Sequence, residues 1–379
     1  MSVTVYIQNL KSSAGIAGDV GELLGQIDEL HSKKMWHQLT EAVLTIVKTD
    51  FLQQSGLMEF YKNVLVDFEH KINPLTLVEI ILYLIREITD PNEAITFMEG
   101  IKEKVKNNME AKVLCMISIG SFNLKVSSLQ AVKSVVEEAG KELDSVSGIT
   151  KVHARYYDLC SNYHKIRADH TAYYHDALHF LGCIDLADLS RDEQTDRAFS
   201  LGLAALLGKD VYNFGELLGH PVIRVLQGTD KQWLIDVMYA FNAGNIEKFE
   251  KLGPLWQQQP DLFQNQDNLL RKIRLLALME LVFRRHAHDR SVTFSDVSKA
   301  ANVPETDVEM LVMKALSLGL VKGQIDEVRQ EIAMHWVQPR VLDLTQAENL
   351  KDRMNEWCGQ IKNTIHYVKD EVPDAILSH

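Results

Sequence analysis

The stretch from Thr293 to Val337 decides the fold, and it reads TFSDVSKAANVPETDVEMLVMKALSLGLVKGQIDEVRQEIAMHWV. Thr293 can accept a hydrogen bond from the first turn of a helix and Asp296 can reach back to it, which is the pattern of a capping box. Pro304 then suits the first position of a second helix, whose apolar residues recur at helical spacing. Gly319 should end that helix. The sequence therefore predicts two short helices in succession.

After the second helix the period of the apolar residues changes from helical to alternating, as in strands. The alternating residues of the first strand and then of the returning strand are Val321, Gly323 and Ile325, followed by Ile332, Met334 and Trp336. Residues 326–330 would form the turn between the two strands. Two short helices followed by a strand pair predict a winged helix.

The charge of this predicted winged helix is acidic. Its seven acids and four bases are Asp296, Glu305, Asp307, Glu309, Asp326, Glu327 and Glu331, against Lys299, Lys314, Lys322 and Arg329. A winged helix that reads DNA needs lysine and arginine, because neutralising phosphates supplies most of the affinity. We therefore expect this module to hold protein and not nucleic acid.

The composition of the whole chain limits the classes of protein to which it can belong. Its 379 residues carry a formal charge of -12, and 46% of them are hydrophobic. This content allows roughly two or three packed domains, and the charge argues against nucleic acid or an anionic membrane as the main partner. No apolar run approaches the roughly 20 residues of a membrane span. The four cysteines are widely spaced, which fits free thiols inside the cell.

From about Gln26 to Arg285, nearly every segment of the chain carries apolar residues at helical spacing. Asn73-Pro74 and Asp90-Pro91 each suit the start of a helix, and the breaks between helices are short and polar. Antiparallel helix pairs of this kind predict a mainly α fold with a right-handed helical-repeat array, an α-solenoid. We expect a loosely ordered N-terminal lead without a signal peptide, the solenoid, the winged helix with its leading helix, and a C-terminal helix with a tail, at residues 1–25, 26–256, 267–340 and 341–379.

The predicted C-terminal helix carries a stripe of large apolar residues. The stripe consists of Leu350, Met354, Trp357, Ile361, Ile365 and Val368. Spacings of 3 and 4 are those of a coiled-coil seam. The helix either folds back on its own domain or joins a helical bundle with other chains.

Several motifs are partial matches to sites of chemistry. His286-Ala287-His288 begins like the signature of a zinc isopeptidase, but the serine and the metal-binding aspartate that should follow are missing. His175 and His179 stand four residues apart, yet neither a third ligand nor a glutamate lies between them. The segment 202–209 does not have the spacing of a phosphate loop. We expect no catalytic residue, no metal and no cofactor.

One predicted helix is basic and offers the best case for nucleic acid. Its positive residues are Arg271, Lys272, Arg274, Arg284 and Arg285. Such residues more commonly pair with acidic neighbours on a solvated face. Trp336 and Trp357 are interpreted as anchors of a hydrophobic core and not as platforms on which bases stack.

A helical-repeat array that leads into an acidic winged helix resembles the PCI domain family. Within that family the chain is similar to the proteasome-lid members through the segments His70–Leu75, Val78–Leu82, Tyr174–Cys183, Asn213–Leu218, Trp233–Asp236, Tyr239–Asn242, Leu311–Gly323, Ile325–Val328 and Trp336–Asp343. These segments span most of residues 34–357, and agreement is least before Leu30. The family also contributes scaffold subunits to the signalosome and to a translation initiation factor.

The resemblance implies a non-catalytic scaffold subunit of the proteasome lid, in the cytoplasm and nucleus, that serves ATP- and ubiquitin-dependent protein degradation. Its partners would be other PCI and lid subunits, with the ubiquitin receptor near the solenoid. A PCI subunit of another complex and a nucleic-acid-binding winged helix are the alternatives. In the family, sheets join across subunits and C-terminal helices gather in a bundle. These roles fall here to the strand residues Leu320, Lys322, Gln324, Ile332, Met334 and Trp336, and to the stripe residues Leu350, Met354, Trp357, Ile361, Ile365 and Val368.

Overall fold

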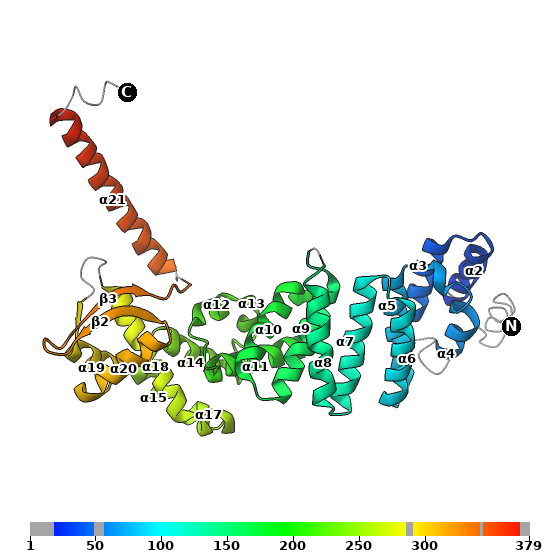
Figure 1. Cartoon of the computed structure of the whole chain (residues 1–379), viewed down its shortest axis with the longest axis horizontal. Helices are drawn as coiled ribbons and strands as arrows, with labels where there is room; N and C mark the ends of the chain where they lie inside the picture. The colour runs from blue at the N-terminus through cyan, green and yellow to red at the C-terminus, as the bar shows by residue number, and fades with distance from the viewer. Residues whose placement is uncertain are drawn as a thin grey trace. The chain divides into compact units, whose positions relative to one another are not determined.

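The computed structural model describes residues 19–48, 57–88, 90–146, 148–285, 291–341 and 344–371. The chain forms two compact units, Met1–Asp188 and Leu189–His379. Figure 1 shows helices through the first unit and a small sheet within the second. The boundary between the units falls inside the range 26–256 that the sequence predicts as a single array.

The first unit is helical throughout its described part. Its elements are α2 (Asp19–Ser32), α3 (Trp36–Lys48), α4 (Leu57–Phe60), η1 (Tyr61–Leu65), η2 (Glu69–Lys71), α5 (Pro74–Leu84), η3 (Ile85–Glu87), α6 (Pro91–Lys104), α7 (Met109–Lys125), α8 (Leu129–Leu143), α9 (Lys151–Ile166), α10 (His170–Cys183) and η4 (Leu186–Asp188). Residues 19–25, which we expected to be loosely ordered, belong to helix α2.

Local side-chain caps set the helix starts of this unit. The Asn73 side chain accepts a hydrogen bond from Leu75 N at 3.0 Å, and Asp90 accepts one from Asn92 N at 3.0 Å. Each cap is followed by proline at the first helical position, where its missing N–H costs nothing. The two predicted starts are confirmed.

Each helix of the first unit packs on its neighbours along the chain. Contacts join α6 to α7, α7 to α8 and α9 to α10, while α7 also reaches α5 and α9. One hydrophobic core runs continuously from Leu24 to Tyr163. A core built by successive pairing, with each helix covering the next, is the organisation of an α-solenoid.

The second unit combines helices with the winged helix. Its elements are α11 (Arg191–Leu207), α12 (Phe214–Gly219), α13 (Pro221–Arg224), α14 (Gln232–Asn242), α15 (Ile246–Lys251), α16 (Gly253–Trp256), α17 (Pro260–Gln264), α18 (Gln266–Arg284), β1 (Ser291–Thr293), α19 (Phe294–Ala301), α20 (Glu305–Ser317), β2 (Val321–Asp326), β3 (Glu331–Val337) and α21 (Leu344–Glu371).

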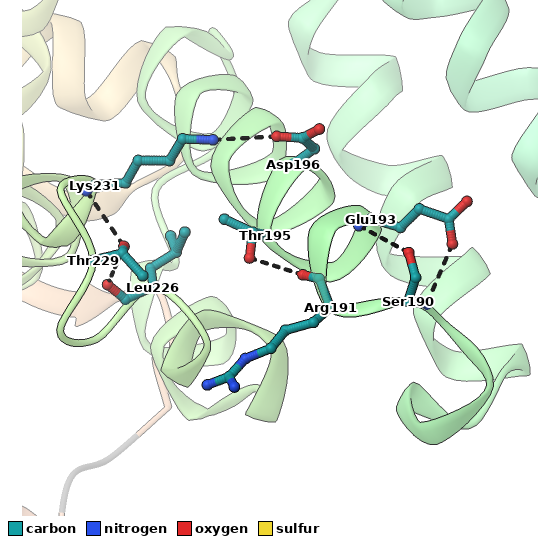
Figure 2. A network of polar contacts seen from close by, with 8 residues as sticks. All are labelled: Ser190, Arg191, Glu193, Thr195, Asp196, Leu226, Thr229 and Lys231. Atoms are coloured by element: carbon teal, nitrogen blue, oxygen red, sulfur yellow. Dashed lines mark hydrogen bonds and ion pairs between the residues drawn. The ribbon is translucent and has the colours of Figure 1, made fainter.

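Helix α11 opens the second unit with a capping box (Figure 2). Ser190 Oγ accepts a hydrogen bond from Glu193 N at 3.3 Å, and the Glu193 carboxylate accepts one from Ser190 N at 3.4 Å. One turn further on, Lys231 donates to Asp196 at 3.2 Å from the turn that precedes α14. The first turns of α11 are therefore capped and tied to a later helix of the same unit.

The winged helix follows the predicted plan. Thr293 accepts a hydrogen bond from Asp296 N at 3.2 Å at the start of α19. Pro304, predicted at the first helical position, is instead the cap residue of α20, which begins at Glu305. Gly319 follows α20 with φ of 68°, a conformation that glycine adopts without strain. The three-stranded antiparallel sheet has the order β1-β3-β2, with a register shift at Lys322/Gly323. Strand β1 was not predicted.

Helix α18 joins the helical part of the second unit to the winged helix. It contacts α11, α14, α15 and α17 on one side, and α19, α20 and β3 on the other. Gly244, with φ of 62°, allows the turn after α14 to approach α18 so closely that a Cβ would lie 2.6 Å from the Ala277 backbone. The helix that we expected to lead into the winged helix is thus packed from both directions.

Lys272 of α18 is buried, which corrects our expectation of a solvated face. Its Nζ donates to the carbonyl oxygens of Ala205, Leu206 and Gly208 at 2.7, 3.2 and 2.7 Å. These carbonyls lie at the C-terminal end of α11, where helix carbonyls lack partners and the dipole favours a cation. Burial lowers the pKa of Lys272 to about 7. The lysine therefore caps α11 and fixes α18 against it.

We predict that Lys272→Met destabilises the protein by about 2–4 kcal/mol, because three buried carbonyls lose their donor. The unfolded lysine keeps its proton up to a pKa of about 10.4, so between pH 7 and 10 the unfolded chain binds more protons. Stability contributed by Lys272 therefore rises with pH over this window. Urea unfolding at pH 7 and pH 9 should show a larger cost of the substitution at pH 9.

The matched control is Arg271→Met, at the exposed neighbouring position. It should change stability by less than about 0.5 kcal/mol at both pH values. A cost of Lys272→Met as small as that of the control would refute the capping role. A large cost that is the same at both pH values would refute the lowered pKa of Lys272 and leave its capping role intact.

Candidate protein-interaction surfaces

The outer strands of the sheet are β1 and β2, and this placement corrects one of our expectations. The resemblance assigns both Leu320–Ile325 and Glu331–Val337 to an edge that a neighbour could extend. Strand β3 lies between β1 and β2, so residues 331–333 are paired on both sides. Among the described residues, nothing pairs with the other side of β2. Its free N–H and C=O groups form the edge that can accept another strand.

The six predicted strand residues divide between the interior and the surface. Leu320, Ile332 and Met334 are buried, because alternate side chains of a strand face the module's own helices. The other three, Lys322, Gln324 and Trp336, are exposed. Lys322 Nζ lies 5.0 Å from the centroid of the Trp336 ring, within range of a cation–π interaction. Only these three can contribute side chains to a partner, and the buried three support the sheet from within.

The apolar stripe of α21 is exposed along its whole length. The exposed fractions of Leu350, Met354, Trp357, Ile361, Ile365 and Val368 run from 41% to 62%. A helix that packed its stripe on its own domain would bury these residues almost completely. The fold-back alternative is therefore not adopted in this structure, and Trp357 is not a core anchor.

The segment that leads from β3 to α21 is anchored on the helical part of the second unit. Arg340 donates to Glu280 of α18 and, at 3.3 Å, to the carbonyl of Asn242. Both charged side chains are at least nine-tenths buried. Val341 passes directly over Gly215, where a Cβ would lie 3.0 Å from the Val341 carbonyl oxygen. We call residues 338–341 the strap, and sequence analysis missed it because its partners lie 60 to 128 residues away.

Three of the five basic residues predicted for this helix are engaged within the protein, whereas Arg271 is exposed. Lys272 is buried as described, and Arg284 pairs with Glu280. Arg285 donates to Asp296 and to the carbonyl of Ser291. The exposed face of α20 instead carries acidic residues beside Met310 and Met313, which are 71% and 48% exposed. Lys272, Arg284 and Arg285 are therefore not free to neutralise phosphates, which weakens the case for nucleic acid.

The histidines singled out in the sequence do not gather into a metal site. His175 and His179 are both exposed, and His179 stacks on Tyr157. His164 lies 3.6 Å from Asp176, whose pKa is raised chiefly by burial. Within the described ranges, no group of three or more potential ligands could hold a metal ion. His286 and His288 lie outside those ranges.

No helix in the part of the chain that the structure describes is both long enough and apolar enough to cross a bilayer.

Comparison with known proteins gives matches along nearly the whole chain. A family model described as PSD13 N-terminal repeats matches residues 23–238, and the PCI domain model matches residues 251–336. The 26S proteasome non-ATPase regulatory subunit 13 of Dictyostelium discoideum is 35% identical over 98% of each chain. Homolog A of that subunit in Arabidopsis thaliana is 34% identical over 100% of each. A probable 26S proteasome regulatory subunit of Schizosaccharomyces pombe is 35% identical over 90% of each.

The division between interior and surface can be tested with one substitution made at two methionines. Met334→Ala should cost about 2–4 kcal/mol in unfolding free energy, because it removes a buried side chain from the sheet. Met354→Ala should change that free energy by less than about 0.5 kcal/mol, since the α21 stripe is exposed. Urea unfolding of both variants, in solution dilute enough for the chain to be monomeric, gives the comparison. Equal costs at the two positions would contradict the assignment of either surface.

Proposed function

This chain belongs to the family of 26S proteasome non-ATPase regulatory subunit 13, and from that membership we propose that it is a non-catalytic structural subunit of the proteasome lid. It would scaffold the regulatory particle for ATP- and ubiquitin-dependent protein degradation in the cytoplasm and nucleus. The observation that carries the proposal is the pair of unpartnered surfaces on its second unit, the outer strand β2 and the stripe of α21. Both are suited to holding other chains.

The outer strand would act by adding a neighbour's backbone to the sheet. Main-chain hydrogen bonds along β2 supply the attraction, and side chains beside the edge select the partner. Lys322, Gln324 and Trp336 are the exposed residues available for this selection. The buried residues Leu320, Ile332 and Met334 keep the sheet in place and do not touch the partner.

Helix α21 would act by joining a helical bundle. Its stripe repeats at coiled-coil spacing, and such a seam buries its residues against helices that carry the same pattern. The proposed partners are other PCI and lid subunits. The first unit, an α-solenoid, would extend the scaffold toward the ubiquitin receptor.

The alternatives find less support in the molecule. A PCI subunit of another complex would share both surfaces, and the relatives named here as proteasome subunits argue against it. A nucleic-acid-binding winged helix would need free cations, whereas Arg284, Arg285 and Lys272 are engaged within the protein.

We predict that Met354→Glu with Ile361→Glu leaves the protein folded but keeps it out of the assembled lid. Both residues are exposed on the stripe, so the charges cost nothing in the free chain and would be buried unpaired in a bundle. The measurement is recovery of the tagged variant in the intact particle, by affinity purification and native electrophoresis. We expect a loss of at least about tenfold, which corresponds to roughly 1.4 kcal/mol.

The control variant is Asn355→Glu with Asn363→Glu, which adds the same two charges on the opposite side of the helix, where both residues are exposed. This protein should be incorporated normally. Incorporation of the stripe variant at the control's level would remove α21 from the proposed assembly mechanism.

A further inference from the structure

The stripe of α21 exposes apolar surface to water in the free chain, before other subunits bind, and this exposure is unfavourable. Six large apolar side chains lie in one row on a helix of 28 residues. Soluble monomers rarely expose a continuous apolar patch of this kind. A helix also depends mainly on the packing of its apolar face for its stability. The free chain therefore has a physical reason to cover the stripe.

We propose that two copies of the free chain cover each other's stripes by pairing their α21 helices in antiparallel orientation. The stripe is nearly palindromic. When Leu350 of one copy faces Val368 of the other, Trp357 faces Ile361, and Met354 falls within one residue of Ile365. Every stripe residue thus lies opposite a stripe residue or one position away from it. A two-fold pair of this kind is closed, so it forms dimers and not filaments.

The size of the contact is sufficient for a dimer of moderate stability. A fully buried aliphatic side chain removes on the order of 100 Å² from water. Twelve such side chains would bury about 1,200 Å², the lower limit for a specific interface. A contact of this area can hold two free chains together and can be replaced by the larger contacts of an assembly.

Charge does not oppose the pairing. The chain as a whole carries -12, but α21 holds nearly balanced charges. Its acids and bases are Glu348, Asp352, Glu356, Asp370 and Glu371, with Lys351, Arg353, Lys362 and Lys369. Two copies of this helix repel each other weakly, while most of the repulsive charge belongs to the rest of each chain.

The strap favours the antiparallel orientation over the parallel one. Arg340 and Val341 hold the N-terminal end of α21 on the helical part of the second unit. A parallel pair would bring the two acidic bodies together at the same end. An antiparallel pair separates the two anchored ends by the length of the helix, about 42 Å at 1.5 Å per residue.

Sedimentation velocity of the purified full-length chain tests the proposal without any other subunit. At about 10–50 µM the wild type should sediment mainly as a dimer of the 43.1 kDa chain. Met354→Glu with Ile361→Glu should be a monomer, and Asn355→Glu with Asn363→Glu should remain a dimer. A wild type that is monomeric throughout, or a stripe variant that stays dimeric, would overturn the proposal.

Disulfide cross-linking tests the orientation. Lys351 and Lys369 are both exposed, and they lie 18 residues, five full turns, apart on the same flank of the stripe. In a Cys358→Ser background, Lys351→Cys and Lys369→Cys proteins should form no cross-linked dimer alone and should form one after mixing and oxidation. A mixed sample of dimeric protein that forms no cross-link would overturn the antiparallel arrangement.

These outcomes are independent of the proposed function. A monomeric wild type whose stripe variant still fails to enter the lid would refute the dimer and leave the scaffold role intact. A monomeric stripe variant that enters the lid normally would support the dimer and refute the role of α21 in assembly.

Discussion

The structure of the second unit depends on how two ionisable side chains buried in α18 are satisfied. A buried polar or charged group is tolerated only when it is paired or hydrogen-bonded. Lys272 donates to the carbonyls that end α11, and Glu280 pairs with Arg340 of the strap. Each side chain therefore requires a particular partner, and one partner lies before α18 in the sequence while the other lies after it. Apolar packing alone would let α18 slide or rotate, whereas these pairs fix it in one position between the helices and the winged helix.

Similar pairing bears on what the winged helix can bind. Two cations in or beside it make internal contacts, because Arg285 ties the end of α18 to Asp296 of α19 and Lys322 lies over Trp336. Acids and methionines remain on the exposed face of α20. A fold that binds DNA elsewhere by offering free cations to phosphates offers here an outer strand and apolar side chains. The charge balance of the module follows from this use of its arginines and lysines.

Sequence reasoning succeeded where structure is decided by a few consecutive residues. The caps at Asn73, Asp90 and Thr293 and the stop at Gly319 are local, because each side chain or backbone conformation acts within one turn. Strand β1 was missed, since its three residues carry too little alternation to be recognised. The order β1-β3-β2 and the burial of Lys272 depend on partners far along the chain, which no local pattern contains. Trp336 and Trp357 were taken for core anchors because large aromatic residues are usually buried, and exposure at a surface reserved for a partner overrides that tendency.

The two surfaces of the PCI module complement each other in what they can supply. The edge of β2 offers backbone groups, which any extended segment could pair with, so it provides attraction with little selectivity. The stripe of α21 offers shape and spacing, which only a helix of matching pattern can fill. The strap joins them, because Arg340 fixes the start of α21 on the same unit that carries the sheet. Once a partner engages one surface, the other is held nearby at a high effective concentration, so a chain that matches both binds far more tightly than a chain that matches either. In the proposed assembly, selectivity would come from the requirement that both contacts form together.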